Sequence, residues 1–488
     1  MMSYPERTVV TGAGLAGFRT VEELRRRGYS GRITLIGAEE RPPYDRPPLS
    51  KKVLTAGVDP SLHADFTSLD VDFRPAETAL AVQAPAPSEP SEPSAPSASA
   101  APAPAPAGSA LITNRDKYPF DHLVLATGAL PVALPGPGPQ RFLRTYDDAL
   151  ALRALLRPGL RLAIVGAGWI GAELATAAAA AGCLVTVVEA GPAPLAAALG
   201  AAIGARTAAW YEQAGVELRT GTAVQSVEPG GLALAGGWLP ADEVVTAIGV
   251  RPAVAWLAGS GVALDNGVAV DPGLRASLPG VYAAGDCAAF VSLRFGARLR
   301  VEHWETALHA PEVVAANILG GAEVYDPVPY FWSEQFGRMV QYAGHHTPAD
   351  RLIWRGDPAG ATWSACWLAG TRMTAALTVN RPRDLLQARR LIAAGTDVDP
   401  ARLADPAIPL RAQATALALA GAGQPRYLTR ISSGGRYLAY FHGGTPVRRG
   451  ARGLGRAGWP DQPDQLRRGR ALAVLVPLGG QAQDLLPV

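Results

Sequence analysis

The chain has 488 residues, of which 48% are apolar and 18% are charged, and its formal net charge is only +3. This length exceeds that of one compact domain and predicts two or three, each with its own core. No run of about 18 uninterrupted apolar residues occurs, so a membrane partner is not expected. The weak charge likewise gives no reason to expect nucleic acid. The first residues run straight into a strand and a glycine turn without an export signal, which predicts a cytoplasmic protein.

The three cysteines, Cys183, Cys287 and Cys366, lie far apart in the sequence. Neither a C-x-x-C metal or redox pair nor a disulfide framework follows from this spacing, so each is expected to be a small core residue. His345 and His346 are adjacent and cannot share one face of a helix or strand, and no metal site is predicted.

Two segments of the chain share one plan. Residues 7–39 read as a strand, a glycine turn, an amphipathic helix and a second strand, and residues 161–189 repeat this order. Each is the beginning of a βαβ unit. The duplication predicts an α/β fold with two Rossmann-like dinucleotide-binding domains.

Three other stretches differ from these units. Residues 81–109 contain 24 Ala, Pro or Ser residues out of 29 and are expected to be a disordered insertion within a domain. From about residue 323, aromatic strand-like pieces precede one helical segment, which predicts a smaller α+β domain. Residues 413–488 are rich in Gly and Arg, with ten Arg against three Asp, and no fold is predicted for them.

The first glycine turn carries a dinucleotide-binding pattern. Gly12, Gly14 and Gly17 form G-x-G-x-x-G between a strand and a helix, and Glu39 follows Gly17 by 22 residues. Such glycines let a pyrophosphate approach the backbone N–H groups at a helix N-terminus, and the acid can accept hydrogen bonds from a ribose. The alternative is a turn that only packs helix on strand.

The second turn repeats the pattern. Gly166, Gly168 and Gly171 form the same motif, and Glu189 follows Gly171 by 18 residues. No Arg or Lys stands near Glu189 in the sequence to neutralise a 2′-phosphate, which favours NAD over NADP unless a remote Arg folds back. Two dinucleotides in one chain indicate hydride transfer between a flavin and a nicotinamide.

Three motifs occur together in the order typical of one family. They are YDRPPLSK at 44–51, LVLATGA at 123–129 and VYAAGDCAAF at 281–290, followed by AIGVRP, VEHWETALHA and PYFWSEQFG. Over residues 7–410 the chain resembles the FAD-dependent ferredoxin, putidaredoxin and rubredoxin reductases of oxygenases and cytochromes P450, which have a glutathione-reductase-like fold. The resemblance implies an oxidoreductase that uses FAD and NADH and donates electrons to an iron–sulfur ferredoxin.

The resemblance also implies site residues. Lys51 would lie near the flavin, where a positive charge favours the reduced anionic ring, and Glu173 would face it near the nicotinamide. The chain contains only three lysines, so the position of Lys51 inside a motif supports a functional role for it. The alternative is that Lys51 caps a helix. The implied FAD contacts are Gly12, Gly14, Gly17, Glu39, Arg46, Lys51, Thr127, Gly128, Asp286, Trp304 and Trp332, and the implied NAD contacts are Gly166, Gly168, Gly171, Glu189 and Gly249.

The domains that follow from the resemblance are an FAD domain at 1–150 and 247–322, an NAD domain at 151–246 and a C-terminal α+β domain at 323–412. The stretch 41–54 lacks the cysteine pair that disulfide reductases place beside the flavin, so electrons are expected to leave the flavin directly. A rubredoxin or nitrite reductase is an alternative acceptor. Further alternatives are a redox sensor like the apoptosis-inducing flavoprotein and a degenerate homologue that does not retain FAD.

The Arg pairs at 448–449 and 467–468 suggest that the tail steers an acidic ferredoxin, with solvated disorder as the alternative. The oligomeric state is not predicted.

Overall fold

The structure is a computed structural model that describes residues 6–85, 104–413, 430–432 and 436–438. The chain divides into two compact units, Met1–Gln413 and Ala414–Val488. In the second unit the described residues form one antiparallel pair, β26 (Arg430–Ser432) with β27 (Arg436–Leu438). The predicted Arg clusters of the tail lie outside the described residues.

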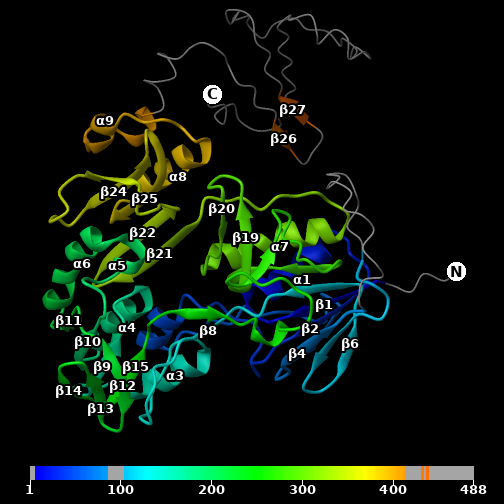
Figure 1. Cartoon of the computed structure of the whole chain (residues 1–488), viewed down its shortest axis with the longest axis horizontal. Coiled ribbons are helices and arrows are strands. Elements are labelled where there is room, and N and C mark those ends of the chain that lie inside the picture. The colour runs from blue at the N-terminus through cyan, green and yellow to red at the C-terminus, as the bar shows by residue number, and fades with distance from the viewer. Residues whose placement is uncertain (1–5, 86–103, 414–429, 433–435, 439–488) are drawn as a thin grey trace, which may run out of the picture. The chain divides into compact units, whose positions relative to one another are not determined.

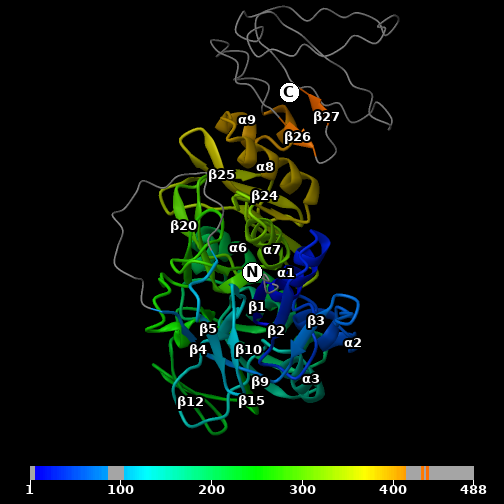
Figure 2. The ribbon, with the colours of Figure 1, turned by 90° about the vertical axis from the view of Figure 1, so that its right-hand side faces the viewer.

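The first sheet of the large unit is parallel. Four of its strands lie within residues 7–125, and the fifth lies at residues 281–283. Its strands are largely buried apolar runs, as expected for a parallel sheet covered on both faces. Helices α1 (Leu15–Arg26) and α7 (Trp304–Ile318) pack against each other beside it. In Figure 2 the strands β1, β2 and β3 lie side by side. The order is β18 (Val281–Ala283), β7 (His122–Leu125), β1 (Arg7–Thr11), β2 (Arg32–Ile36) and β3 (Val71–Arg74).

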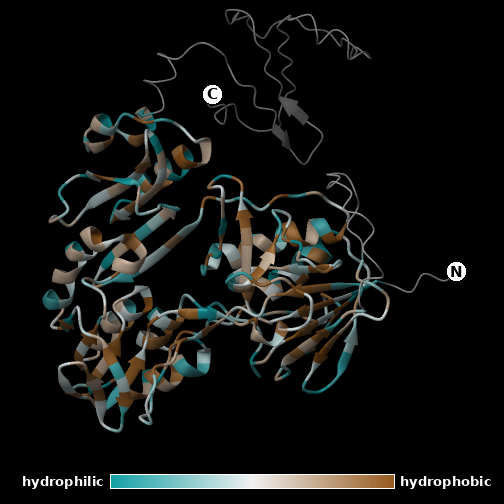
Figure 3. Ribbon diagram, in the orientation of Figure 1, coloured by the Kyte–Doolittle hydropathy of each residue, from teal (hydrophilic) through white to brown (hydrophobic). Residues whose placement is uncertain are grey.

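The second sheet is also parallel and repeats this plan. Helix α4 (Trp169–Ala180) connects its first strand in the sequence to its second. Helices α5 (Ala196–Leu199) and α6 (Ala201–Gln213) lie between the second strand and the third. The brown strands of Figure 3 show how apolar residues concentrate in both sheets. The strand order is β11 (Glu217–Arg219), β10 (Leu184–Val188), β9 (Arg161–Val165) and β15 (Glu243–Thr246).

The third sheet is antiparallel and lies in the C-terminal part of the large unit (Figure 1). One face packs against α8 (Pro382–Ala394), and the other packs against apolar side chains of α5 and α6. The four aromatic strand-like pieces and the helix predicted from the sequence are present, whereas the strand at 372–379 was not predicted. The order is β21 (Tyr330–Gln335), β22 (Arg338–Gly344), β25 (Arg372–Val379), β24 (Trp363–Ala369) and β23 (Arg351–Arg355).

Four small sheets and several short helices complete the large unit. The sheets are β4 (Ala79–Gln83), β5 (Ala110–Thr113) and β6 (Lys117–Pro119); β8 (Ala129–Pro131) and β16 (Val250–Pro252); β12 (Val224–Glu228), β13 (Gly231–Leu234) and β14 (Gly237–Pro240); and β17 (Val268–Val270), β19 (Ala288–Ser292) and β20 (Ala297–Leu299). The remaining helices are a π-helical turn (Leu49–Val53), α2 (Leu54–Ala56), α3 (Tyr146–Leu155), α9 (Pro400–Ala404) and 3-10 turns at Ala255–Leu257, Gly285–Cys287 and Leu410–Ala412.

The expectation of disorder from 81 to 109 was too broad. Val82 pairs with Leu111 and Gln83 with Ala110, so the segment begins inside a strand of an antiparallel hairpin. Ala105 and Ser109 near its other end are buried. The hairpin can include these residues because Val82 supplies apolar surface that the Ala-Pro-Ser composition lacks. Residues 86–103 lie outside the described part. Among the helices that are described, none has the length and apolar character needed to cross a bilayer.

Candidate active site

The first glycine turn is shaped by close backbone contacts. A Cβ on Gly12 would lie 2.1 Å from the carbonyl oxygen of Ala126, and a Cβ on Gly17 would lie 1.9 Å from that of Gly12. Gly12 also has a positive φ of 104°. The middle glycine differs, because a Cβ on Gly14 would meet only the tip of the Arg46 side chain, at 2.8 Å. Gly14 is therefore the point where a pyrophosphate can approach the turn.

Glu39 lies beside this turn, three residues beyond the end of β2 rather than at its last position. Its carboxylate accepts hydrogen bonds from the Tyr44 hydroxyl at 2.6 Å and from Arg46 Nη2 at 2.9 Å. The Nε of Arg46 is buried and has no hydrogen-bond partner. A buried guanidinium N–H without a partner, on a side chain that lies against Gly14, fits a phosphate oxygen, so these residues fit an FAD pyrophosphate.

The second glycine turn has the same shape without the arginine. A Cβ on Gly166 would lie 2.5 Å from the carbonyl oxygen of Ala247, and one on Gly171 would lie 2.0 Å from that of Gly166. Around the middle glycine, Gly168, no heavy atom lies within 4 Å of such a Cβ. The N-terminus of α4 is thus open to a second pyrophosphate, as an NAD site requires.

Glu189 follows β10 directly and is fixed by backbone groups alone. Its two oxygens accept hydrogen bonds from the N–H groups of Ala167 and Gly191, both at 2.7 Å. The nearest strand neighbour is Arg219 on β11, whose guanidinium pairs with Glu217 at 2.8 Å. Arg219 could not be placed near Glu189 from sequence spacing, because it is 30 residues away and arrives through strand pairing.

Lys51 and Glu173 meet where the π-helical turn at Leu49–Val53 contacts α4. The ammonium of Lys51 lies 2.8 Å from Glu173 Oε2, and the Glu173 side chain is only 4% exposed. Ser50 also donates a hydrogen bond to Oε2. The pair that the resemblance implied is therefore present as an ion pair across 122 residues of sequence. The bond from Lys51 to the Pro47 carbonyl, at 3.4 Å, is longer, so capping is the weaker of its two contacts.

A backbone irregularity lets two consecutive residues reach one carboxylate. Within the π-helical turn, Lys51 leaves the helical conformation with φ −122° and ψ −106°. Neighbouring side chains on a regular helix point about 100° apart and could not both bind one oxygen. The break directs Ser50 and Lys51 to the same atom of Glu173.

A third cluster surrounds the 3-10 turn after β18. Asp286 forms a 2.8 Å ion pair with Arg144, and Arg144 Nη2 lies 3.4 Å from where a Cβ of Gly128 would be. Thr127 donates its hydroxyl to the carbonyl of Ala253 at 2.8 Å. The structure thus brings Thr127, Gly128 and Asp286 together. Arg144 was not predicted, since no motif contains it.

The remaining predicted residues lie on two sides of this region. Trp304 begins α7 and donates its indole N–H to Asp45 at 2.9 Å, while its ring meets that of Trp332 edge to face at 5.9 Å. The two tryptophans are therefore neighbours. Gly249 precedes β16 and has a φ of 106°, and no heavy atom lies within 4 Å of where its Cβ would be.

His303 lies beside Trp332, with its ring 5.0 Å away. Its Nδ1 accepts a hydrogen bond from the N–H of Glu305 and so caps α7. Burial, together with the positive charges of Lys51 and Arg389, lowers the pKa of His303 to about 3. The imidazole is neutral at physiological pH.

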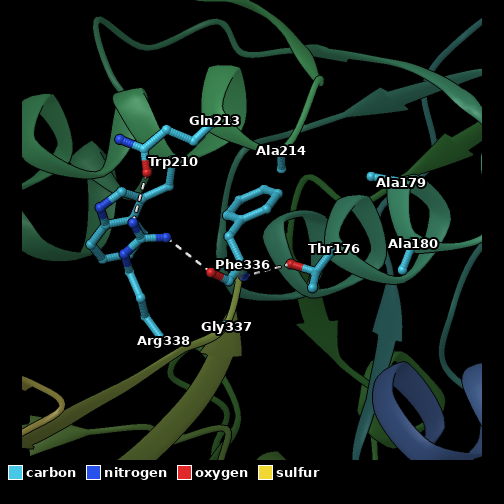
Figure 4. Close-up of a pocket in the computed structure, with 9 residues that line it drawn as sticks. All are labelled: Thr176, Ala179, Ala180, Trp210, Gln213, Ala214, Phe336, Gly337 and Arg338. Carbon is cyan, nitrogen blue, oxygen red and sulfur yellow. Dashed lines mark hydrogen bonds between the residues drawn. The ribbon is translucent and has the colours of Figure 1, made fainter. Parts of the chain in front are cut away.

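A hollow of about 380 Å³ lies elsewhere, between α4, α6 and the turn that joins β21 to β22. Figure 4 shows Trp210, Gln213, Phe336 and Arg338 around it. It contains none of the predicted site residues. The glycine turns are a better guide to the chemistry, because they carry the pyrophosphate-binding geometry. Within residues 6–85 and 104–413, no group of three or more His, Cys, Asp or Glu could hold a metal ion.

Comparison with known proteins gives consistent matches. The model of the pyridine nucleotide-disulphide oxidoreductase family matches residues 6–310, and the reductase C-terminal model matches residues 330–414. The ferredoxin–NAD(+) reductase component of the anthranilate 1,2-dioxygenase system of Burkholderia cepacia is 36% identical over 83% of this chain and 98% of its own.

Two solved structures are similar over most of the chain. The crystal structure of Fdr9 is 47% identical, with a TM-score of 0.75 over 83% of this chain and 99% of that one. Putidaredoxin reductase in its covalent complex with putidaredoxin is 28% identical, with a TM-score of 0.76 over 86% of this chain and all of that one.

Proposed function

Because the chain belongs to the pyridine nucleotide-disulphide oxidoreductase family, and within it to the ferredoxin–NAD(+) reductases, we propose that it takes hydride from NADH onto FAD. It then passes single electrons to a two-iron two-sulfur ferredoxin that serves a P450 or a Rieske oxygenase. The observation that carries this proposal is the Lys51–Glu173 ion pair, since it joins the region of the FAD turn to the helix of the NAD turn. We propose that the reaction takes place in the cytoplasm, where metabolism supplies NADH.

The residues of this chain divide the work of binding. Gly12, Gly14 and Gly17 admit the FAD pyrophosphate, with Arg46 above the middle glycine and Glu39 beside the ribose. Gly166, Gly168 and Gly171 admit the pyrophosphate of NADH, and Glu189 receives its ribose hydroxyls. Asp286 with Thr127 and Gly128 borders the FAD, and Gly249 borders the nicotinamide side.

At the junction of the two sites, Lys51 holds a positive charge that Glu173 keeps in one place. When bound, the FAD accepts hydride from NADH and releases electrons one at a time. A fixed ammonium beside the flavin favours the anionic reduced ring. Trp304 and Trp332 shield the site from water, so the nicotinamide and flavin can stack in a dry environment.

The proposal that electrons pass directly from the flavin to a protein rests on the absence of a cysteine pair that could relay them. All three cysteines fall in the described residues and are buried, and the stretch 41–54 contains none. A dithiol relay beside the flavin is therefore not available, and a one-electron acceptor fits better. The relatives named as ferredoxin–NAD(+) reductase component and putidaredoxin reductase support a ferredoxin.

The test is anaerobic stopped-flow reduction of the flavin by NADH. We expect Lys51→Ala to slow the reduction about tenfold or more, as is typical when a hydrogen-bonded charge is removed from a reacting group. The matched control is Lys52→Ala, because Lys52 is the next residue and is exposed. Equal rates for wild type and Lys51→Ala would contradict the role of Lys51.

A second mixing step tests the acceptor. The reduced protein is mixed with oxidised putidaredoxin, and fast reoxidation of the flavin is expected. A long-lived complex of reduced flavin with NAD, reoxidised only slowly by this acceptor, would instead indicate a redox sensor.

A further inference from the structure

The carboxylate of Glu173 receives four hydrogen bonds, more than its pairing with Lys51 requires. Ser50 and Lys51 donate to Oε2, while Ser333 donates to Oε1 at 2.7 Å and the N–H of Glu334 donates to Oε1 at 3.3 Å. The donors come from two places far apart in sequence, the π-helical turn and β21. Glu173 itself lies on α4. One buried carboxylate on α4 therefore links the π-helical turn to the C-terminal sheet.

The surroundings of Ser333 determine which group its hydroxyl donates a hydrogen bond to. Ser333 is 1% exposed, and its oxygen accepts a hydrogen bond from Gln335 Nε2 at 3.0 Å. Gln335 is also 1% exposed. Because a serine hydroxyl has one proton, and Gln335 supplies another, the O–H of Ser333 is committed to Glu173. The chain Gln335, Ser333, Glu173 and Lys51 is thus a single directed network.

Strand β21 is held along α4 on both sides of Ser333. Before it, the Phe331 ring meets Trp169 edge to face at 4.4 Å. After it, the N–H of Phe336 donates to Thr176 Oγ1 at 2.9 Å, as Figure 4 shows. The α4 residues in this series are 169, 173 and 176, which lie on one face of a helix. Ser333 cannot move away from Glu173 without breaking these contacts.

The turn that follows strengthens the attachment. Phe336 and Gly337 both have positive φ, 49° and 75°, which is a costly conformation for phenylalanine. The turn inserts the Phe336 ring against Tyr211, with ring centres 4.6 Å apart. Arg338 then binds Gln213 at 2.7 Å and lies over the Trp210 ring. The C-terminal sheet is anchored to the helices of the second parallel sheet at the position that fixes Ser333.

We propose that Ser333 is a positioning residue for hydride transfer, acting through Glu173 on Lys51, and this inference rests on the proposed role of that pair. Without the hydroxyl, Oε1 of Glu173 keeps only the longer bond from a backbone N–H. The carboxylate then loses the shorter of its two bonds at Oε1, which weakens the orientation in which Oε2 holds the ammonium of Lys51. The C-terminal sheet therefore helps to set the geometry of the Lys51–Glu173 pair through a hydroxyl group.

The experiment compares Ser333→Ala with Ser364→Ala in the FAD-loaded full chain. Ser364 is the matched control, because it is also 1% exposed on the same sheet but donates its hydroxyl to Asp384. The limiting rate of flavin reduction and the apparent Kd for NADH are measured by anaerobic stopped flow. We expect Ser333→Ala to lower the limiting rate about tenfold and to leave Kd within about twofold, since a hydrogen bond to a charged group is lost. Ser364→Ala should keep both values.

Two further variants separate positioning from packing. Ser333→Cys keeps the size and a weak donor, so its rate should lie between those of wild type and Ser333→Ala. Ser333→Ala in the Lys51→Ala background should cause less than half of the loss, on a logarithmic scale, that it causes in wild type. Equal losses in both backgrounds, or equal losses for Ser333→Ala and Ser364→Ala, would overturn the inference.

The outcome also separates this inference from the function on which it rests. If Lys51→Ala slows reduction and Ser333→Ala does not, the inference fails and the proposed function stands. If Lys51→Ala has no effect, the role of the pair itself is wrong, whatever Ser333→Ala does.

Discussion

The two glycine turns have the same backbone shape but different surroundings. At the first, Arg46 lies over the middle glycine and Glu39 is bonded by the side chains of Tyr44 and Arg46. At the second, nothing stands within 4 Å of a Cβ on Gly168, and Glu189 is held by backbone N–H groups alone. One turn is closed by side chains and the other is open.

This difference matches two kinds of ligand. A side chain that must move before the ligand leaves slows dissociation, which suits an FAD that stays bound through many turnovers. An open turn with a rigid acid suits NADH, which must enter and leave in each cycle. Under the proposed assignment, the first copy of the βαβ unit would hold a resident cofactor and the second copy would receive an exchanging substrate.

The largest expected effect comes from filling the third glycine of each turn. Gly17→Ala and Gly171→Ala both place a Cβ about 2 Å from a carbonyl oxygen of the same turn. Such a clash costs on the order of 1–3 kcal/mol, or about a 5- to 150-fold loss of binding. We expect Gly17→Ala to purify without bound FAD, as its absorbance at 450 nm will show. Gly171→Ala should stay yellow but need far more NADH for reduction.

Gly236→Ala is the control, since a Cβ there meets no heavy atom within 4 Å. If both Gly17→Ala and Gly171→Ala lost FAD, the assignment of separate ligands to the two turns would be wrong.

Removing the side chain that closes the first turn should have the next largest effect. Arg46→Ala deletes a guanidinium that pairs with Glu39 and lies at Gly14. Loss of hydrogen bonds to a charged group predicts FAD affinity about tenfold weaker or more, with unchanged apparent Kd for NADH. Equilibrium dialysis of FAD gives the measurement. Arg41→Ala removes an exposed pair with Asp147 nearby and should retain FAD like wild type.

The acid of the second turn should control the choice of coenzyme. Glu189→Ala removes the carboxylate that would receive the ribose hydroxyls and repel a 2′-phosphate. We expect the ratio of flavin-reduction efficiency with NADH to that with NADPH to fall about tenfold. Glu212→Ala, an exposed acid on α6, should keep the ratio of wild type. An unchanged ratio for Glu189→Ala would show that specificity lies elsewhere, with Arg219 the next residue to test.

The sequence predicts those parts of the molecule whose signal is local. Both glycine turns follow from spacing, because the three glycines of each motif stand in one short segment and the third glycine packs on the carbonyl of the first. The Lys51–Glu173 pair was implied only by family resemblance, since no local pattern connects residues 122 positions apart. The same reason hides Ser333 and Arg144, whose partners are brought near by packing of separate sheets.

The conformation of Lys51 was hidden for a different reason. Its departure from the helix lies in a stretch whose prolines and lysines would fit an ordinary turn equally well. Similarly, strand β25 has buried Met373, Ala375 and Leu377 but also Thr374 and Thr378, so its alternation is weak as a strand signal.

The smallest effect is expected at His303, which caps α7 beside Trp332. Its folded pKa of about 3 is below the unfolded value of about 6.5, so the unfolded chain binds an extra proton at intermediate pH. Burial of the neutral imidazole therefore makes its full contribution to the free energy of unfolding above pH 6.5, and this contribution is lost as the pH falls toward 3. Between pH 6.5 and 5.5 the free energy of unfolding should decrease by about 1 kcal/mol. His303→Asn keeps a capping side chain for α7 but removes the titration, so its free energy of unfolding should fall less over this interval.

Urea unfolding at the two pH values measures the difference, and His309→Asn, on the exposed side of the same helix, is the control. Equal pH dependence in wild type and His303→Asn would show that the imidazole is not held neutral.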